Sequence, residues 1–476
     1  MSDMSMFMHG IGIEAFVDER SSDYQPVDVD VGELVTANQQ LNLLSGELVE
    51  QRERVSALIE ARDFAVASNQ ALSEHVAAEL RQRVMAVVGE DRAAFIVGSV
   101  ESYNGPLGHQ LLNAGLESIG GFLRAALEAL IKLIRAGAKV LANFFASARV
   151  VLGNQLRAID ALSTAVDSKV EGWDEMMVRV GKSNPSPSAG YFDTKEVPPL
   201  NSKPASKPSA PSADLSPQAF SSLVVSSGST TFIPSELCGF LNTTCAIITG
   251  QCMDVVAGFN KQYTALLDLF GDAGKFKDGL SAFSGLQQLS ADKFLPLKRM
   301  RYQDKDSTAT HAEFATAPLL GDVRFRVRCR REALYASEAR APGNRFNNAN
   351  GLASMSVSLD ADGAPSWVSG KTVRALKRYD AQQSLRLIDG LVKTVIDSPL
   401  QAQANALSRQ ADKIASTTLA RLNTDDDIMK QFQEYAINIM SGMTNLTAAG
   451  PRLLIGYVNN LATSVREFVE LSGDLK

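Results

Sequence analysis

Residues 124–145, RAALEALIKLIRAGAKVLANFF, decide the fold. The charged side chains of this stretch follow one another at intervals of four, four, three and four residues: Arg124, Glu128, Lys132, Arg135 and Lys139. This spacing draws one polar stripe along a helix and leaves the rest of its surface apolar. A helix with so wide an apolar face belongs in a helical bundle or on a membrane surface. The stripe mixes Glu with Arg and Lys instead of being uniformly basic, so the pattern favours the bundle.

Helical patterns continue on both sides of this stretch. Upstream, residues 31–88 carry apolar side chains at helical spacing among Glu and Arg, and the helical block around the quoted stretch covers about 107–180. Further helices are expected at about 234–271.

From Lys371 to the chain end, the pattern predicts four antiparallel helices joined by short connections, which favours a bundle. Pro399 starts the second helix, and Thr424 with the acids after it caps the third. Gly450-Pro451 is expected to separate the third helix from the fourth. Two apolar stripes are expected to be buried, in the first and fourth helices: Leu385, Ile388, Leu391, Val392 and Val395, and Leu454, Val458, Leu461, Val465, Phe468 and Val469.

Two stretches differ in composition from these helices. Residues 182–218 contain eight of the 17 prolines with Ser, Ala and Lys between them, which is typical of a flexible tether. Residues 293–368 contain strand-like pieces, and a turn signal at 360–363 follows the last of them. The pieces are 294–302, 313–319, 323–330 and 355–359. They predict a small antiparallel sheet inserted into a helical domain.

The chain has 476 residues, more than the roughly 250–300 that one hydrophobic core usually serves, so several folded units are expected. The sequence predicts a mainly α protein with a small antiparallel β-sheet insertion, an α+β fold in which a proline-rich linker joins helical bundles. The expected segments are an acidic helical N-terminal segment at 1–101, a helical domain at 102–181, the linker at 182–218, a helical segment at 219–292, the sheet insertion at 293–368 and a C-terminal helical bundle at 369–476.

Charge is unevenly distributed along the chain. Residues 1–101, the N-terminal segment, carry a formal charge of −11, although the whole chain carries only −6. Residues 102–476, the body, therefore carry +5. This division indicates an N-terminal segment that acts separately or is detached, or else a solvated acidic tail that serves solubility alone.

The sequence lacks the common motifs of catalysis and cofactor binding. Gly271–Lys275 has the wrong spacing for a phosphate-binding loop, and Phe follows its lysine. His311-Ala312-Glu313 matches one half of a zinc-deaminase signature whose cysteine half is absent, so a solvent-facing strand histidine is expected. Cys238, Cys245 and Cys252 span about 21 Å on a helix, too far for one metal ion, and are expected to be buried thiols. We therefore expect neither an enzyme nor a cofactor.

Four arginines alternate with apolar residues in 323–330: Arg324, Arg326, Arg328 and Arg330. On a strand, this alternation places four guanidinium groups on one face and the apolar side chains on the other. Two interpretations stay open. The arginines contact nucleic-acid phosphates through sequence-independent attraction, or they form a solvated sheet face paired with acids on neighbouring strands.

No stable membrane span is expected. Met1–Gly12 lacks the basic start of a secretory signal, and the longest uncharged stretch, Leu237–Met253, is polar in places and short for a bilayer. A membrane-active or pore-forming helical protein, acting through 107–150 or 237–253, is kept as the alternative function.

The chain resembles the internal head (inner body) proteins of phiKZ-like jumbo tailed bacteriophages. The resemblance lies in the architecture of most of the chain and in several segments: MHGIGIEAFVDE at 8–19, GLESIGGFLRAALEALIKLI at 115–134, the proline-rich tether, VRFRVRCRR at 323–331, LRLIDGLVKTVID at 385–397 and MKQFQEYAINIMSGMTNL at 429–446. It implies a non-enzymatic structural protein, made in the host cytoplasm and packaged inside the phage head among other head proteins. Ejection with the DNA is a further expectation.

The resemblance also implies an N-terminal propeptide that a prohead protease removes after a Ser/Ala-x-Glu tripeptide. Ser99-Val100-Glu101 is the favoured site, because Glu101 ends the acidic segment and precedes Gly105-Pro106, an expected exposed break. The alternatives are Glu47, Glu79 and Glu128, and a further tripeptide ends at Glu338. Removal of the acidic segment would leave a basic body suited to lie beside packaged DNA.

Overall fold

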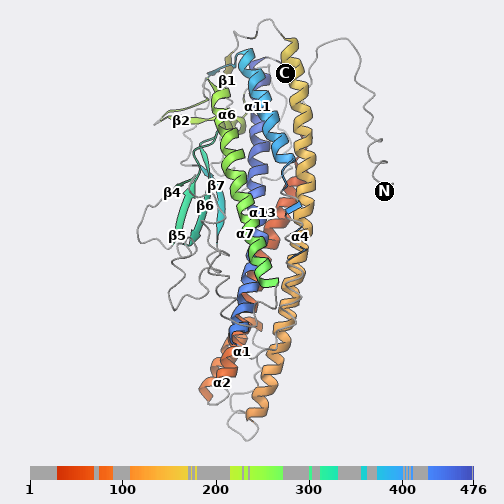
Figure 1. The fold of residues 1–476 in the computed structure, drawn as a ribbon, viewed down its shortest axis with the longest axis vertical. Coiled ribbons are helices and arrows are strands. Elements are labelled where there is room, and N and C mark those ends of the chain that lie inside the picture. Colours follow the sequence, from red (N-terminus) through yellow and green to blue (C-terminus); the bar gives the residue numbers. More distant parts are fainter. Residues whose placement is uncertain are drawn as a thin grey trace, which may run out of the picture.

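The computed structural model of the chain describes residues 29–68, 74–88, 108–169, 173, 177–179, 215–227, 230–233, 236–271, 300–302, 311–330, 355–361, 372–399, 402–403, 406, 409–410, 427–473 and 475. Long helices run along the long axis of the molecule, and a small sheet lies on one side of them (Figure 1). This arrangement confirms the predicted fold class, mainly α with a small antiparallel sheet.

Helix α4, Gly108–Ser168, has 61 residues and contains the stretch 124–145. The five charged residues of the predicted polar stripe are all exposed along it. The apolar residues between them are buried: Leu127, Leu130, Ile131, Ile134, Leu141, Phe144 and Phe145. The wide apolar face of α4 therefore packs inside a helical bundle, as the mixed charge of the stripe predicts.

Helices α1, Gly32–Ser68, and α2, Glu74–Val88, divide the single helical stretch expected at 31–88. Helix α1 runs beside the first half of α4 in the opposite direction (Figure 1). Helix α2 is tied to α1 by a cation–π contact, in which the Arg83 guanidinium lies 4.6 Å from the centre of the Phe64 ring.

Helices α11 and α13 cover the second half of α4. Helix α11, Arg378–Ile396, buries all five of its predicted apolar residues. It begins later than the predicted start at Lys371, because Thr372–Arg374 pairs with Met177–Arg179 as strands β8 and β1. The predicted helix start at Pro399 and the cap at Thr424 lie at or beyond the edge of the described residues.

Helix α13, Asp427–Ser472, continues through Gly450 and Pro451, so the predicted break at this dipeptide is wrong. Proline inside a helix removes a backbone hydrogen bond and crowds the preceding turn, which usually costs about 3 kcal/mol. Packing outweighs that cost, because the predicted apolar stripe from Leu454 to Val469 is fully buried. Gly450 helps as well: a Cβ there would lie 2.8 Å from Cγ2 of Val256, so the glycine allows α13 to approach α7 closely.

Two helices joined by a π-helical turn occupy the stretch at about 234–271 in which helices are expected. Helix α6, Leu237–Ile247, passes through the turn Ile248–Cys252 into α7, Met253–Gly271. Such a turn holds one extra residue and shifts the phase of the helix. Cys252, the last residue of this turn, is fully buried, whereas Cys238 and Cys245 before the turn are half-buried.

The antiparallel sheet has the strand order β4-β5-β6-β7. Its strands are Arg301–Tyr302, His311–Ala315, Val323–Arg330 and Ser356–Ala361, and a separate hairpin pairs β2, Val225–Ser227, with β3, Thr230–Phe232. Strand β6 has its predicted bounds, but β5 ends before Leu319 because the chain turns through Gly321 and Asp322 at positive φ. Strand β7 continues through the expected turn at Asp360, which lies opposite Arg324 on β6.

Leu320 attaches the sheet to the helices. Its backbone N–H donates to the Thr244 hydroxyl of α6 at 3.2 Å, and its carbonyl accepts from the Tyr457 hydroxyl of α13 at 2.9 Å. Because both groups are buried, these bonds fix the position of the sheet on the bundle.

One hydrophobic cluster joins residues from both sides of the predicted linker. It includes Leu130 of α4, Phe325 of the sheet and Phe468 of α13. Residues 182–214 of that linker lie outside the described residues, and its last residues are folded: Ser216 caps α5, Pro217–Leu223, and its hydroxyl donates to Glu467 of α13.

A clasp holds the end of α4 against the chain end. It consists of the β1–β8 pair, Trp173, Arg378 and Gly473. The buried Trp173 indole donates to the Leu376 carbonyl at 2.7 Å, and its ring fills the space that a side chain at Gly473 would need. The Arg378 guanidinium donates to the carbonyls of Val166 and Asp167, which satisfies the C-terminus of α4.

Candidate functional sites

The candidate cleavage residues lie in different structural settings. Glu47 is exposed in the middle of α1, and Glu128 is exposed on α4. Glu79 on α2 forms an ion pair of 2.7 Å with Arg83 one turn later. Ser99-Val100-Glu101 and Glu338 lie outside the described residues, with Glu101 between the end of α2 at Val88 and the start of α4 at Gly108. The three alternatives inside the first 130 residues are therefore all helical.

Helix α1 belongs to the acidic N-terminal segment and yet is part of the core. Its buried residues face α4 and α13: Leu34, Ala37, Leu41, Leu48, Val55, Leu58 and Ile59. Two polar contacts fix its position. The Gln51 amide donates to the Ala126 carbonyl of α4 at 2.9 Å, and the Arg452 guanidinium of α13 donates to Oδ1 of Asn42 at 2.8 Å. The N-terminal segment is thus bound through a large apolar interface, which its charge alone does not suggest.

Strand β6 places the predicted alternation on two faces. Phe325, Val327 and Cys329 are buried, whereas the arginines between them point away from the core. Arg326 forms an ion pair of 2.6 Å with Glu313 on β5 and lies 3.9 Å from Asp360 on β7. This residue therefore fits the interpretation of a sheet face paired with acids on neighbouring strands.

The other arginines differ in their surroundings. Arg324 is half-buried and donates to the Thr316 carbonyl at 3.1 Å. Arg328 is exposed and forms no ion pair with the acids that the structure describes. The side chain of Arg330 lies outside the described ones. Among the described side chains of this stripe, Arg328 accordingly has the charge most accessible to an anionic partner.

Burial makes the cysteine thiols unreactive. It raises the pKa of Cys245, Cys252 and Cys329 to about 12, so these thiols stay protonated near neutral pH. Desolvation also raises the pKa of Cys238, with a further contribution from the nearby Asp380 carboxylate. His311 begins β5 on the same face as Glu313 and is half-buried. In the described part of the chain, no three His, Cys, Asp or Glu side chains are grouped as metal ligands would be.

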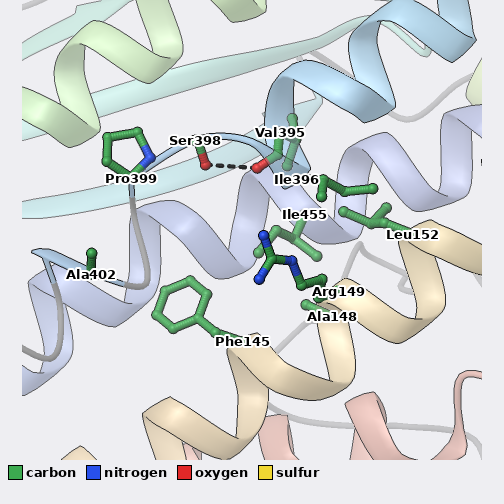
Figure 2. Close-up of a pocket in the computed structure, with 10 residues that line it drawn as sticks. All are labelled: Phe145, Ala148, Arg149, Leu152, Val395, Ile396, Ser398, Pro399, Ala402 and Ile455. Atoms are coloured by element: carbon green, nitrogen blue, oxygen red, sulfur yellow. Dashed lines mark hydrogen bonds between the residues drawn. The ribbon is translucent and has the colours of Figure 1, made fainter. Parts of the chain in front are cut away.

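A cavity of about 200 Å³ opens between α4, the end of α11 and α13 (Figure 2). Its walls are mostly apolar, from Phe145, Leu152 and Ile455, and the Arg149 side chain reaches across it. The Ser398 hydroxyl at its edge donates to the Val395 carbonyl at 2.6 Å. The cavity contains one charged side chain, which gives it no catalytic pair.

A buried polar network between α4 and α13 was not predicted. The Gln155 side chain donates to Asn459 at 3.0 Å and to Thr463 at 2.8 Å, and it accepts from Arg466 at 2.9 Å. Arg466 lies 3.9 Å from Glu470. Gln155 lies three residues after Leu152 and four before Ile159 on the apolar face of α4, and this polar interruption of an apolar stripe is the signal that could have identified the network.

None of the helices within the described residues is long and apolar enough to cross a membrane. The fold thus defines an elongated α+β protein in which helices from distant parts of the chain share one core.

Residues 26–183 match the model of a family described as phiKZ-like phage internal head proteins. The match covers α1, α2, α4 and β1 and ends where the proline-rich stretch begins. Over this third of the chain, the protein is similar to that family, and the resemblance seen in the sequence is confirmed. The match supports a structural role in the virion, inside the phage head. No curated protein and no solved structure matches the chain.

Proposed function

We propose that the chain is a structural protein of the phage head that is made with an acidic propeptide, residues 1–101, and is cut by the prohead protease after Glu101. The family match over residues 26–183 is the observation that carries the structural role. The division of charge, −11 before the cut and +5 after it, supports the removal of this segment.

The positions of the alternative residues support Glu101. A protease binds its substrate in an extended conformation, so a site inside a helix must first unfold locally. Glu47, Glu79 and Glu128 each lie within a helix, and the helices of Glu47 and Glu128 are packed together. A cut after Glu101 falls between the end of α2 at Val88 and the start of α4 at Gly108, outside the helices that hold the three alternatives.

The body left by this cut is the part proposed to lie beside packaged DNA. Its charge of +5 attracts phosphates without sequence preference, and Arg328 presents an exposed guanidinium on the sheet. Ejection together with the DNA is a further part of this proposal, and detection of the body in infected cells after synthesis is blocked would test it.

Mass spectrometry of purified virions tests the proposal directly. We expect the virion-borne protein to begin at Ser102 and peptides from 1–101 to be depleted relative to those from the body. A start at Leu48 or Leu80 would keep the propeptide but move the cut. Recovery of peptides from 1–101 in proportion to the rest would contradict the proposal.

A second candidate function is activity at a membrane. It is favoured by the burial of the apolar face of α4 against α1, because removal of residues 1–101 would uncover part of that face. Leakage of vesicles caused by residues 102–476 but not by the full chain would support this function. If neither protein causes leakage, the membrane activity is contradicted and the structural role is the candidate function that remains.

A further inference from the structure

The contact between α1 and the body is too extensive to be broken by one cut. Seven buried apolar residues of α1, from Leu34 to Ile59, share a cluster with α4 and α13. A cut after Glu101 removes the covalent connection and leaves every one of these contacts in place. The proposed cleavage therefore produces a non-covalent complex, and the lifetime of that complex decides when the N-terminal segment leaves.

Arg452 is the weak point of this contact. It projects from α13 toward α1, where its Nη1 donates to the neutral amide oxygen of Asn42 at 2.8 Å. Its Nε is shielded from solvent and has no hydrogen-bond acceptor among the residues that the structure describes. No carboxylate among the described residues forms an ion pair with it. Burial without a counter-charge lowers the pKa of Arg452 to about 10.

Arg466, on the same helix, provides a comparison, because it has a carboxylate near its guanidinium. It lies about four turns of α13 beyond Arg452, donates to Gln155 and has the Glu470 carboxylate 3.9 Å away. A nearby carboxylate partly offsets the free-energy cost of desolvating a cation, whereas a neutral amide alone does not. Release of α1 returns water to Arg452 and removes this penalty, so the arginine favours departure.

We propose that Arg452, held at the α1–α13 contact by the amide of Asn42, acts as a release element that limits how long the cut N-terminal segment stays bound to the body. The biological use of this element rests on the proposed cleavage, but its action on the contact does not. It is a property of the full chain that any cut between α2 and α4 would reveal.

The test is a dissociation measurement on the full chain carrying a recognition site for a sequence-specific protease in place of residues 99–101. After the cut, a fluorescent label on the N-terminal segment is chased with excess unlabelled segment, and its loss from the body is followed by size exclusion. Asn42→Asp gives the half-buried Arg452 guanidinium a carboxylate partner. Charged hydrogen bonds are about twice as strong as neutral ones, so we expect release to slow by about tenfold.

Two controls make the result specific. Gln40→Glu adds the same charge at an exposed position of α1, and its release rate should equal that of the unmodified chain. Adding Arg452→Gln to Asn42→Asp removes the cation, and the gain should be lost. Equal release rates for Asn42→Asp and Gln40→Glu, or a gain that survives Arg452→Gln, would overturn the proposal. Loss of the segment at once on cutting would also overturn it, because no bound state would remain to be limited.

The outcome is independent of the natural processing site. A virion protein that begins at Met1 would remove the proposed cleavage while leaving the measured effect of Asn42→Asp intact. A virion protein that begins at Ser102, together with an unchanged release rate, would retain the cleavage and remove Arg452 as its release element.

Discussion

Individual arginines on β6 differ in what their charge can do. Arg326 is neutralised by Glu313 at 2.6 Å, and Arg328 is exposed without such a partner. We expect Arg328→Gln to weaken duplex DNA binding by the body and to reduce the salt slope of binding by about 1, as loss of one phosphate contact does. Arg326→Gln, with the same charge change, should leave the slope unaltered. Equal slopes for both variants in a salt titration would support the solvated sheet face.

Gln155 is a polar residue that we expect to stabilise the core through its hydrogen bonds to α13. It is completely buried and bonds three partners on α13, so Gln155→Leu leaves Asn459 and Arg466 without their partner. We expect the free energy of unfolding to fall by about 2–3 kcal/mol, measured by denaturant titration. Gln40→Leu, at an exposed position of α1, should change it by less than about 0.5 kcal/mol. Similar losses for the two variants would mean that the network contributes nothing.

Local periodicity predicts the exposure of residues within one helix, but it does not predict contacts between distant segments. The stripe from Arg124 to Lys139 repeats within one helix, so its exposure follows from spacing alone. The Arg326–Glu313 pair was one of two open interpretations, because it joins neighbouring strands. Asn42 and Arg452 are separated by 410 positions, and only the packing of α1 on α13 brings them together.

At the scale of the element, α13 shows packing overriding propensity. Gly450-Pro451 is typical of a helix end, yet the helix continues, because its residues from Leu454 to Val469 are buried in the core. Sequence patterns report the cost of the proline but not the contacts that offset it.

Gly450→Ala tests the close approach of α13 to α7. The added methyl group would meet Val256 Cγ2 at 2.8 Å, so we expect a loss of about 1–3 kcal/mol in the free energy of unfolding. Gly153→Ala on α4 is the matched control, because its Cβ meets nothing within 4 Å and should add about 0.5–1 kcal/mol. Val256→Ala in the Gly450→Ala background should recover part of the loss. A gain with Gly450→Ala would show that the helices separate easily there.

At the scale of the whole molecule, we expect the shared core to hold the two pieces together after the chain is cut. We expect limited proteolysis of the folded protein to cut first within 182–214, where proline-rich composition cannot offset chain entropy. The two pieces should elute together under native conditions, because α4 packs against α11 and α13 and the clasp joins β1 to β8. They should separate in denaturant.

A first cut inside 371–470 would contradict the expected linker. Elution of two separate pieces without denaturant would contradict the shared core instead. The two outcomes are read from the same digest, by mass spectrometry of the fragments and by their elution volumes.

The length of α4 has a consequence for crowding. Its 61 residues extend for about 90 Å, and the other long helices lie along the same axis (Figure 1). A particle of this shape sweeps out far more volume in end-over-end rotation than in sliding along its axis. At high concentration inside a closed shell, such particles gain translational freedom by adopting a common orientation. Copies of this protein should therefore favour a common orientation at high concentration more strongly than spheres of equal mass do.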